Sequence, residues 1–90
     1  MNVKIALVTG ANTGIGKEIA LSFASKGIKV YIASRSYDRT LPVIQAIEKL
    51  YGAHKCVWLS LDLKSIKSIN RCADSFFEQN ESLDYLVNNA

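Results

Sequence analysis

Residues 3–18 read VKIALVTGANTGIGKE, an apolar run followed by a glycine-rich loop and the start of a helical pattern. A glycine loop between a first strand and a first helix is the usual site of a dinucleotide pyrophosphate in open parallel sheets. We expect Gly10 to permit a sharp exit from the strand, Gly14 to let the backbone come close to phosphates, and Gly16 to let the helix pack tightly on the sheet. The free N–H groups at the helix start, reinforced by the helix dipole, would attract the negative charge.

The rest of the chain repeats this order of strand and helix. Short, nearly continuous apolar runs at 3–9, 30–34, 56–61 and 85–88 predict four strands, and continuous runs are typical of parallel sheets covered on both faces. Stretches of helical period separate these runs. The alternation predicts an α/β fold of the Rossmann-like, doubly wound kind, with a parallel sheet and three helices. No repeat, linker or low-complexity tract interrupts it, so we expect residues 1–90 to belong to one domain.

Each expected helix has an apolar face toward the sheet. The positions that define these faces are Ile15, Ile19, Phe23 and Ala24 in the first helix, Leu41, Ile44, Ile47 and Leu50 in the second, and Ile66, Ile69, Cys72, Ala73, Phe76 and Phe77 in the third. Ser65 is the expected cap of the third helix. The start of the second helix stays open. Pro42 fits the first turn if Thr40 is the cap, but it fits poorly if the helix begins at Asp38.

Composition and charge exclude several classes of protein. The formal charge of the 90 residues is +3, but Lys and Arg are dispersed singly among acidic residues, so nucleic acid is not an expected partner. Cys56 and Cys72 lack the spacing of a metal site, and we expect two reduced core thiols and no bound metal. The first apolar run is too short for a signal sequence, and no run approaches the roughly 18 apolar residues that span a bilayer. The expected location is cytoplasmic.

Two other phosphate-binding motifs do not match this segment of the sequence. The triphosphate loop GxxxxGK[ST] would need Gly at Ala11 and Ser or Thr at Glu18, and the GxGxxG loop would need Gly or Ala at Ile19. What remains, TGxxxGIG at residues 9–16, resembles the glycine loop of the short-chain dehydrogenase/reductase family. The resemblance implies cofactor contacts from Gly10, Asn12, Thr13, Gly14, Ile15 and Gly16.

Two later motifs extend the resemblance. Asp62 and Leu63 in the LDL sequence resemble the family's acidic position that contacts adenine, although Asp62 also suits a turn or cap before the third helix. Asn88, Asn89 and Ala90 resemble the family's NNAG motif, cut before its glycine, which lines the cofactor's ribose and braces the sheet. Together with ASR at residues 33–35, these motifs most resemble the retinol-dehydrogenase-like branch. The family's sheet implies the order 3-2-1-4 for an incomplete sheet of four strands.

The end of the second strand predicts which dinucleotide is bound. An acidic residue there hydrogen-bonds the free ribose hydroxyls of NAD, whereas a basic residue accommodates the 2′-phosphate of NADP. Here Ser34 takes the acidic position and Arg35 follows it, and a planar guanidinium suits a phosphate group. We therefore predict NADP(H) as the cofactor, with assistance from Arg39. The alternative for Arg35 is a solvated surface arginine.

No residue of the chain is assigned a catalytic role. The resemblance implies an alcohol or carbonyl oxidoreductase whose catalytic Asn, Ser and YxxxK residues follow NNAG. We therefore expect an inactive, NADP-binding portion of such an enzyme, with a carbonyl or alcohol substrate bound only in a full-length form. Tyr51 and Lys55 do spell YxxxK, but they flank an expected helix-to-strand turn.

The alternative is a non-catalytic remnant of a truncated reading frame that binds a nucleotide or a partner. In either case Leu86 and Val87 lie on an apolar edge strand without a further neighbour, from which we expect self-association.

Overall fold

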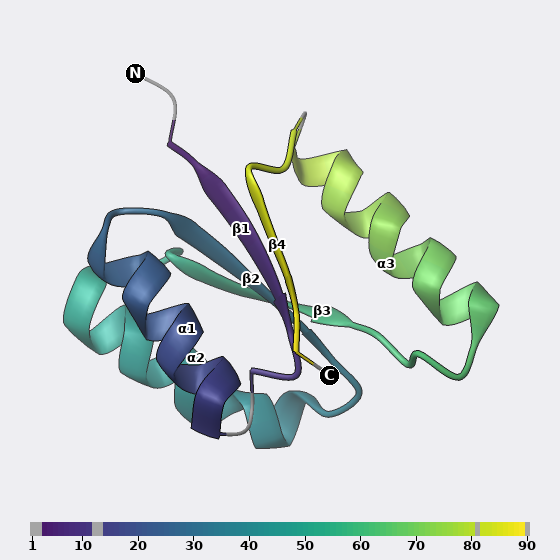
Figure 1. The fold of residues 1–90 in the computed structure, drawn as a ribbon, viewed down its shortest axis with the longest axis horizontal. Coiled ribbons are helices and arrows are strands. Elements are labelled where there is room, and N and C mark those ends of the chain that lie inside the picture. Colours follow the sequence, from purple (N-terminus) through teal and green to yellow (C-terminus); the bar gives the residue numbers. More distant parts are fainter. Residues whose placement is uncertain (1–2, 12–13, 81, 90) are drawn as a thin grey trace.

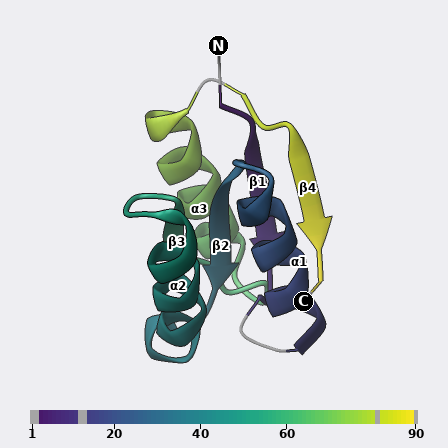
Figure 2. The same ribbon diagram turned by 90° about the vertical axis from the view of Figure 1, so that its left-hand side faces the viewer.

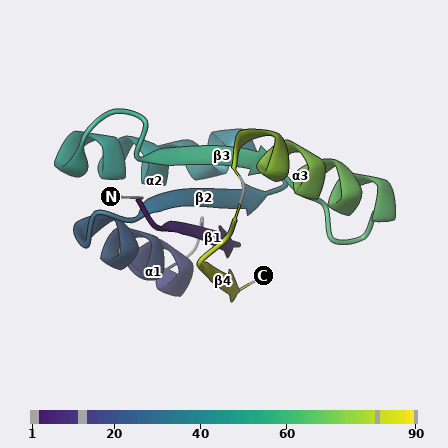
Figure 3. The same ribbon diagram turned by 90° about the horizontal axis from the view of Figure 1, so that it is seen from above.

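The computed structural model describes residues 3–11, 14–80 and 82–89, and these form four strands and three helices. In chain order the elements are β1 (Ile5–Thr9), α1 (Gly14–Ser25), β2 (Lys29–Ser34), α2 (Tyr37–Tyr51), β3 (Cys56–Ser60), α3 (Ile66–Gln79) and β4 (Tyr85–Asn88) (Figure 1). The strand order is β3-β2-β1-β4, and every neighbouring pair is parallel. Figure 3 shows the four arrows running in the same general direction. The predicted Rossmann-like fold and strand order are confirmed.

Helices cover both faces of the sheet. Figure 2 shows α1 and α2 in front of the sheet and α3 behind it. The side chains of β2 alternate between two cores: Val30 and Ile32 pack under α1 and α2, whereas Tyr31 and Ala33 pack under α3. All four side chains are at most 1% exposed. Burial on both sides explains why this strand is apolar at successive positions rather than at alternate ones.

The apolar stripes of the helices are only partly buried, which corrects the prediction. Ile15 and Ile66, in the first turns of α1 and α3, are 74% and 77% exposed. Leu50, in the last turn of α2, is exposed as well. Phe77 is 60% exposed, since successive helical residues point about 100° apart and Phe76 already faces the sheet.

Three strand boundaries also differ. β1 begins at Ile5, so Val3 lies outside the strand, and β2 begins at Lys29, one residue earlier than predicted. β3 ends at Ser60, so Leu61 begins the turn that follows. Leu61 is nevertheless buried in the core under α3. The described β4 matches the predicted strand at 85–88.

α2 begins at Tyr37, earlier than either of the two starts that the sequence left open, so neither a Thr40 cap nor a start at Asp38 is correct. Ser36 is the cap instead: its Oγ accepts a hydrogen bond from the backbone N–H of Arg39 at 3.2 Å. Thr40 is buried within the helix, where its hydroxyl donates to the Ser36 carbonyl at 2.8 Å. Pro42 therefore lies in the second turn and removes one helical hydrogen bond. Its side chain is exposed, so water can replace the missing partner.

Candidate functional site

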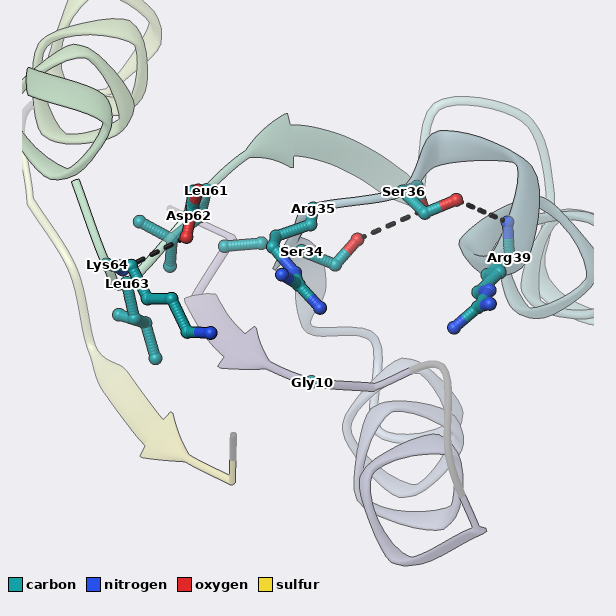
Figure 4. Close-up of a pocket in the computed structure, with 10 residues that line it drawn as sticks. Gly10, Ser34, Arg35, Ser36, Arg39, Leu61, Asp62, Leu63 and Lys64 are labelled. Atoms are coloured by element: carbon teal, nitrogen blue, oxygen red, sulfur yellow. Dashed lines mark hydrogen bonds between the residues drawn. The ribbon is translucent and has the colours of Figure 1, made fainter.

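The carboxyl ends of β1, β2 and β3 meet at one edge of the sheet and border a pocket of about 640 Å³. Two backbone hydrogen bonds join these ends: Gly10 donates to the Ala33 carbonyl at 3.2 Å, and Leu61 donates to the Ser34 carbonyl at 2.9 Å. The described residues that line the pocket are Gly10, Ala33, Ser34, Arg35, Ser36, Arg39, Leu61, Asp62, Leu63 and Lys64 (Figure 4). Its volume and its place at the carboxyl edge of a parallel sheet are typical of a ligand site.

The glycine loop has the backbone geometry that the sequence predicts. Gly10 has a φ of 66°, in the left-handed region that favours glycine, where the chain leaves β1. A Cβ atom placed on Gly16 would lie 2.6 Å from the Gly10 carbonyl oxygen, so only glycine allows α1 to start this close to β1. Gly14 is open instead, with no described heavy atom within 4 Å of the corresponding position. Asn12 and Thr13 lie outside the described residues.

The asparagines that follow β4 brace this loop. Asn88 Oδ1 accepts a hydrogen bond from the Thr9 hydroxyl at 3.2 Å, and the backbone N–H of Asn89 donates to the same hydroxyl at 2.9 Å. Asn89 Nδ2 donates to the Gly10 carbonyl at 3.1 Å. The bracing role that the family resemblance implies for these residues is therefore present. Ala90 lies outside the described residues.

The hydroxyl of Ser34 is bonded within the protein. Trp58 Nε1 donates to Ser34 Oγ at 2.9 Å, and the hydroxyls of Ser34 and Thr40 are 2.6 Å apart. Both hydroxyls also lie within hydrogen-bonding distance of the Ser36 carbonyl, Ser34 Oγ at 3.3 Å and Thr40 Oγ1 at 2.8 Å. These bonds link Trp58, Ser34 and Thr40 to the backbone of Ser36 in one chain, which ties down the backbone on both sides of Arg35.

Three cationic side chains extend into the pocket. Arg35 and Arg39 come from the turn between β2 and α2 and from the first turn of α2, whereas Lys64 comes from the turn between β3 and α3 (Figure 4). Among the lining residues that the structure describes, Asp62 is the one acid, and its Oδ1 accepts a hydrogen bond from the backbone N–H of Lys64 at 3.0 Å. The pocket therefore carries an excess of positive charge.

The pocket brings together part of the predicted site. Its lining contains Gly10, Ser34, Arg35, Asp62 and Leu63, together with Arg39, which was expected to assist Arg35. The other described members of the predicted set do not line it and lie instead around the glycine loop and the end of β4: Gly14, Ile15, Gly16, Asn88 and Asn89. Sequence reasoning missed Ala33, Ser36, Leu61 and Lys64. A signal for Lys64 was available, because it directly follows the LDL motif.

A sequence model of the short chain dehydrogenase family matches residues 4–90. The chain belongs to the short-chain dehydrogenase family. Retinol dehydrogenase 11 of Mus musculus is 41% identical over 87 residues, which are 97% of this chain and 28% of that relative. The chain therefore spans less than a third of the length of this curated short-chain dehydrogenase. The similarity agrees with the resemblance to the retinol-dehydrogenase-like branch.

Solved structures of the family share the fold. Menthone neomenthol reductase from Mentha piperita superposes with a TM-score of 0.88 at 39% identity, over 100% of this chain and 32% of that one. RhlG of Pseudomonas aeruginosa, solved as an active-site complex with NADP, superposes with a TM-score of 0.84 at 36% identity, over 97% of this chain and 34% of that one.

The two cysteines of this short-chain dehydrogenase chain are free and buried. Burial, followed by the negative charge of Glu48, raises the pKa of Cys56 to about 12, and burial also raises the pKa of Cys72. Such thiols stay protonated near neutral pH and are weak nucleophiles. Within residues 3–11, 14–80 and 82–89, no three His, Cys, Asp or Glu side chains gather as metal ligands. In the same ranges no helix combines the length and apolar character of a membrane span.

Proposed function

We propose that these residues form the NADP(H)-binding portion of an oxidoreductase that interconverts alcohols and carbonyl compounds. The observation that carries the proposal is the pair of guanidinium groups beside the end of β2, from Arg35 and Arg39, in a pocket where Ser34 occupies the position of an NAD-selecting acid. The 2′-phosphate is the group that distinguishes NADP from NAD. Arginine binds such a group through parallel hydrogen bonds.

The other parts of the site fit the rest of a dinucleotide. The first N–H groups of α1 have no partner within the helix, and the helix dipole adds positive potential there. The open side of Gly14 would let a diphosphate reach these groups, together with Gly10, Asn12, Thr13, Ile15 and Gly16. Asp62 and Leu63 would contact the adenine, and Asn88, Asn89 and Ala90 would line the ribose. The solved complex of RhlG with NADP supports this choice of cofactor.

The described residues contribute binding and orientation to the reaction. A bound nicotinamide supplies or accepts a hydride. Arg35 would hold the phosphate end of the adenosine, and α1 would hold the diphosphate, so that the dinucleotide lies along the carboxyl edge of the sheet. Because the chain spans 28% of the mouse relative, substrate binding and turnover are proposed for the complete protein.

Dissociation constants for NADP⁺ and NAD⁺, measured by calorimetric titration of the protein encoded by the complete reading frame, test this proposal. We expect tighter binding of NADP⁺. Arg35→Ala should weaken NADP⁺ binding by roughly 10- to 100-fold, because a hydrogen bond between charged groups contributes about 1.5–3 kcal/mol, and it should leave NAD⁺ binding nearly unchanged. Arg71→Ala, at an exposed arginine of α3 outside this pocket, is the matched control. Tighter binding of NAD⁺ by the unaltered protein would refute the proposal.

A further inference from the structure

The pocket has two walls, and its cations come from both. Arg35 and Arg39 belong to the wall formed by the end of β2 and the start of α2, whereas Lys64 belongs to the opposite wall, formed by the turn from β3 to α3. Figure 4 shows the side chain of Lys64 extending across the pocket toward the guanidinium of Arg35. We infer that Lys64 is a specificity-determining residue whose ammonium group binds the 2′-phosphate from the side opposite Arg35. This inference rests on the proposed function, because it concerns the same cofactor.

The backbone that carries Lys64 is fixed by hydrogen bonds. Asp62 Oδ1 accepts from the N–H of Lys64 at 3.0 Å, and the Asp62 carbonyl accepts from the N–H of Ser65 at 3.0 Å. The N–H of Asp62 donates in turn to Ser68 Oγ at 2.7 Å, in the first turn of α3. A turn tied to both its own aspartate and the next helix holds the Lys64 Cα in place. The lysine therefore begins from a defined point on the pocket wall.

The charge balance of the pocket favours an anion with more than one negative charge. Three cations line it against the single described carboxylate of Asp62, and that carboxylate is already engaged with backbone N–H of Lys64. A 2′-phosphate carries up to two negative charges, whereas the ribose hydroxyl of NAD carries none. Lys64 would therefore strengthen the binding of NADP and leave that of NAD unchanged. The planar guanidinium groups of Arg35 and Arg39 bind a phosphate only in certain orientations. The compact ammonium group of Lys64 can donate hydrogen bonds in several directions, so it complements them.

The test compares Lys64→Ala with Lys67→Ala. The second variant removes the same charge from an exposed lysine that lies three residues further along the chain and outside the pocket. Both lysines are exposed, so neither variant should lose its fold. The measurement is the dissociation constant of NADP⁺, NAD⁺, adenosine 2′-phosphate and adenosine 5′-phosphate, by calorimetric titration of the protein from the complete reading frame. Low and physiological salt are compared, because salt screens such interactions.

We expect Lys64→Ala to weaken the binding of NADP⁺ and adenosine 2′-phosphate by about two- to fivefold at low salt, as for one exposed ion pair. NAD⁺ and adenosine 5′-phosphate should change by less than about twofold on the same grounds. Lys64→Arg should keep most of the affinity, and Lys67→Ala should behave as the unaltered protein. The salt dependence of NADP⁺ binding should also be weaker in Lys64→Ala.

The two proposals fail in different ways. If the unaltered protein prefers NADP⁺ and Lys64→Ala keeps that preference in full, Lys64 is a solvated surface lysine and only this inference is wrong. An equal loss for NADP⁺ and NAD⁺ would also overturn it, because that result shows a general effect on the turn. If the unaltered protein binds NAD⁺ more tightly, or binds neither dinucleotide, the proposed function is wrong as well.

Discussion

Gly16 is the position where one added methyl group has the best-defined consequence. A Cβ there would lie 2.6 Å from both the Gly10 carbonyl oxygen and Asn89 Nδ2, and 2.8 Å from the Cα of Ala11. Two of these three atoms belong to the backbone, and Asn89 Nδ2 is itself bonded to the Gly10 carbonyl at 3.1 Å. The neighbours therefore cannot move independently. Gly16→Ala must push α1 away from the sheet or break the bond that ties β4 to the glycine loop.

The size of the effect follows from three contributions. Overpacking by one methyl group costs about 1–3 kcal/mol, and the loss of the Asn89–Gly10 hydrogen bond costs about 1 kcal/mol more. The higher helix propensity of alanine offsets about 0.5–1 kcal/mol of this loss. We therefore expect Gly16→Ala to lower the free energy of unfolding by about 2 kcal/mol, the sum of these three estimates.

Gly14→Ala is the matched comparison, because it adds the same group to the same helix. No described heavy atom lies within 4 Å of its Cβ position, so this variant should unfold at the same urea concentration as the unaltered protein or a higher one. Its methyl group would instead occupy the space proposed for the diphosphate, so NADP⁺ should bind more weakly.

Urea unfolding followed by circular dichroism measures the stability of both variants, and calorimetry measures their affinity for NADP⁺. The reasoning is refuted if Gly16→Ala is as stable as the unaltered protein, or if Gly14→Ala is the less stable of the two.

Four other variants probe the strand ends and the core. Ser34→Ala should keep the preference for NADP⁺, whereas Ser34→Asp should weaken NADP⁺ binding by at least about tenfold, because a carboxylate repels the phosphate; titrations with both dinucleotides decide this. Burial raises the pKa of Cys56 from an ordinary 9.0 to about 12 in the folded chain, so unfolding above pH 9 releases the thiol proton. The contribution of the buried, protonated thiol to stability is therefore complete below pH 9 and is lost as the pH rises toward 12. Stability measured against pH should fall less steeply over this range in Cys56→Ala, and an unchanged slope would contradict the assignment. We also propose that the isolated 90-residue chain self-associates along β4, where Leu86 is 63% exposed. Leu86→Lys should reduce this association in sedimentation experiments, and a monomeric unaltered chain at high concentration would argue against it.

The fold could be predicted because several local signals agree. Apolar runs, helical periods and terminal glycines each pointed to the same alternation of strand and helix. The start of α2 could not be predicted, because Ser36 and Thr40 are both capping residues and only the structure shows which one bonds the helix N–H groups. The exposed Ile15 and Ile66 were misassigned for a related reason: periodicity defines the face of a helix, but not which of its turns are covered by the rest of the protein.

The candidate site was less predictable, because its lining is assembled from separate turns. The motif around Arg35 was recognisable, since a rule connects the end of β2 with the choice of dinucleotide. Lys64 belongs to another turn, and its approach to Arg35 depends on the pairing of β2 with β3, in which Ser34 lies beside Ser60. Without that register, a lysine after LDL cannot be told from any solvated lysine.

Ser34 shows how the fold and the choice of cofactor are connected in this chain. Its hydroxyl accepts from Trp58 on β3 and lies within hydrogen-bonding distance of the Thr40 hydroxyl and the Ser36 carbonyl, so its single hydrogen is used within the protein. Its proposed effect on the cofactor therefore lies in its small size and lack of charge, and recognition of the phosphate is left to the cations around it. The same bonds hold β2, β3 and α2 at the spacing that places Arg35 and Lys64 on facing walls. Ser34→Ala removes these bonds while leaving a small, uncharged side chain, so it should lower the free energy of unfolding and still keep the preference for NADP⁺.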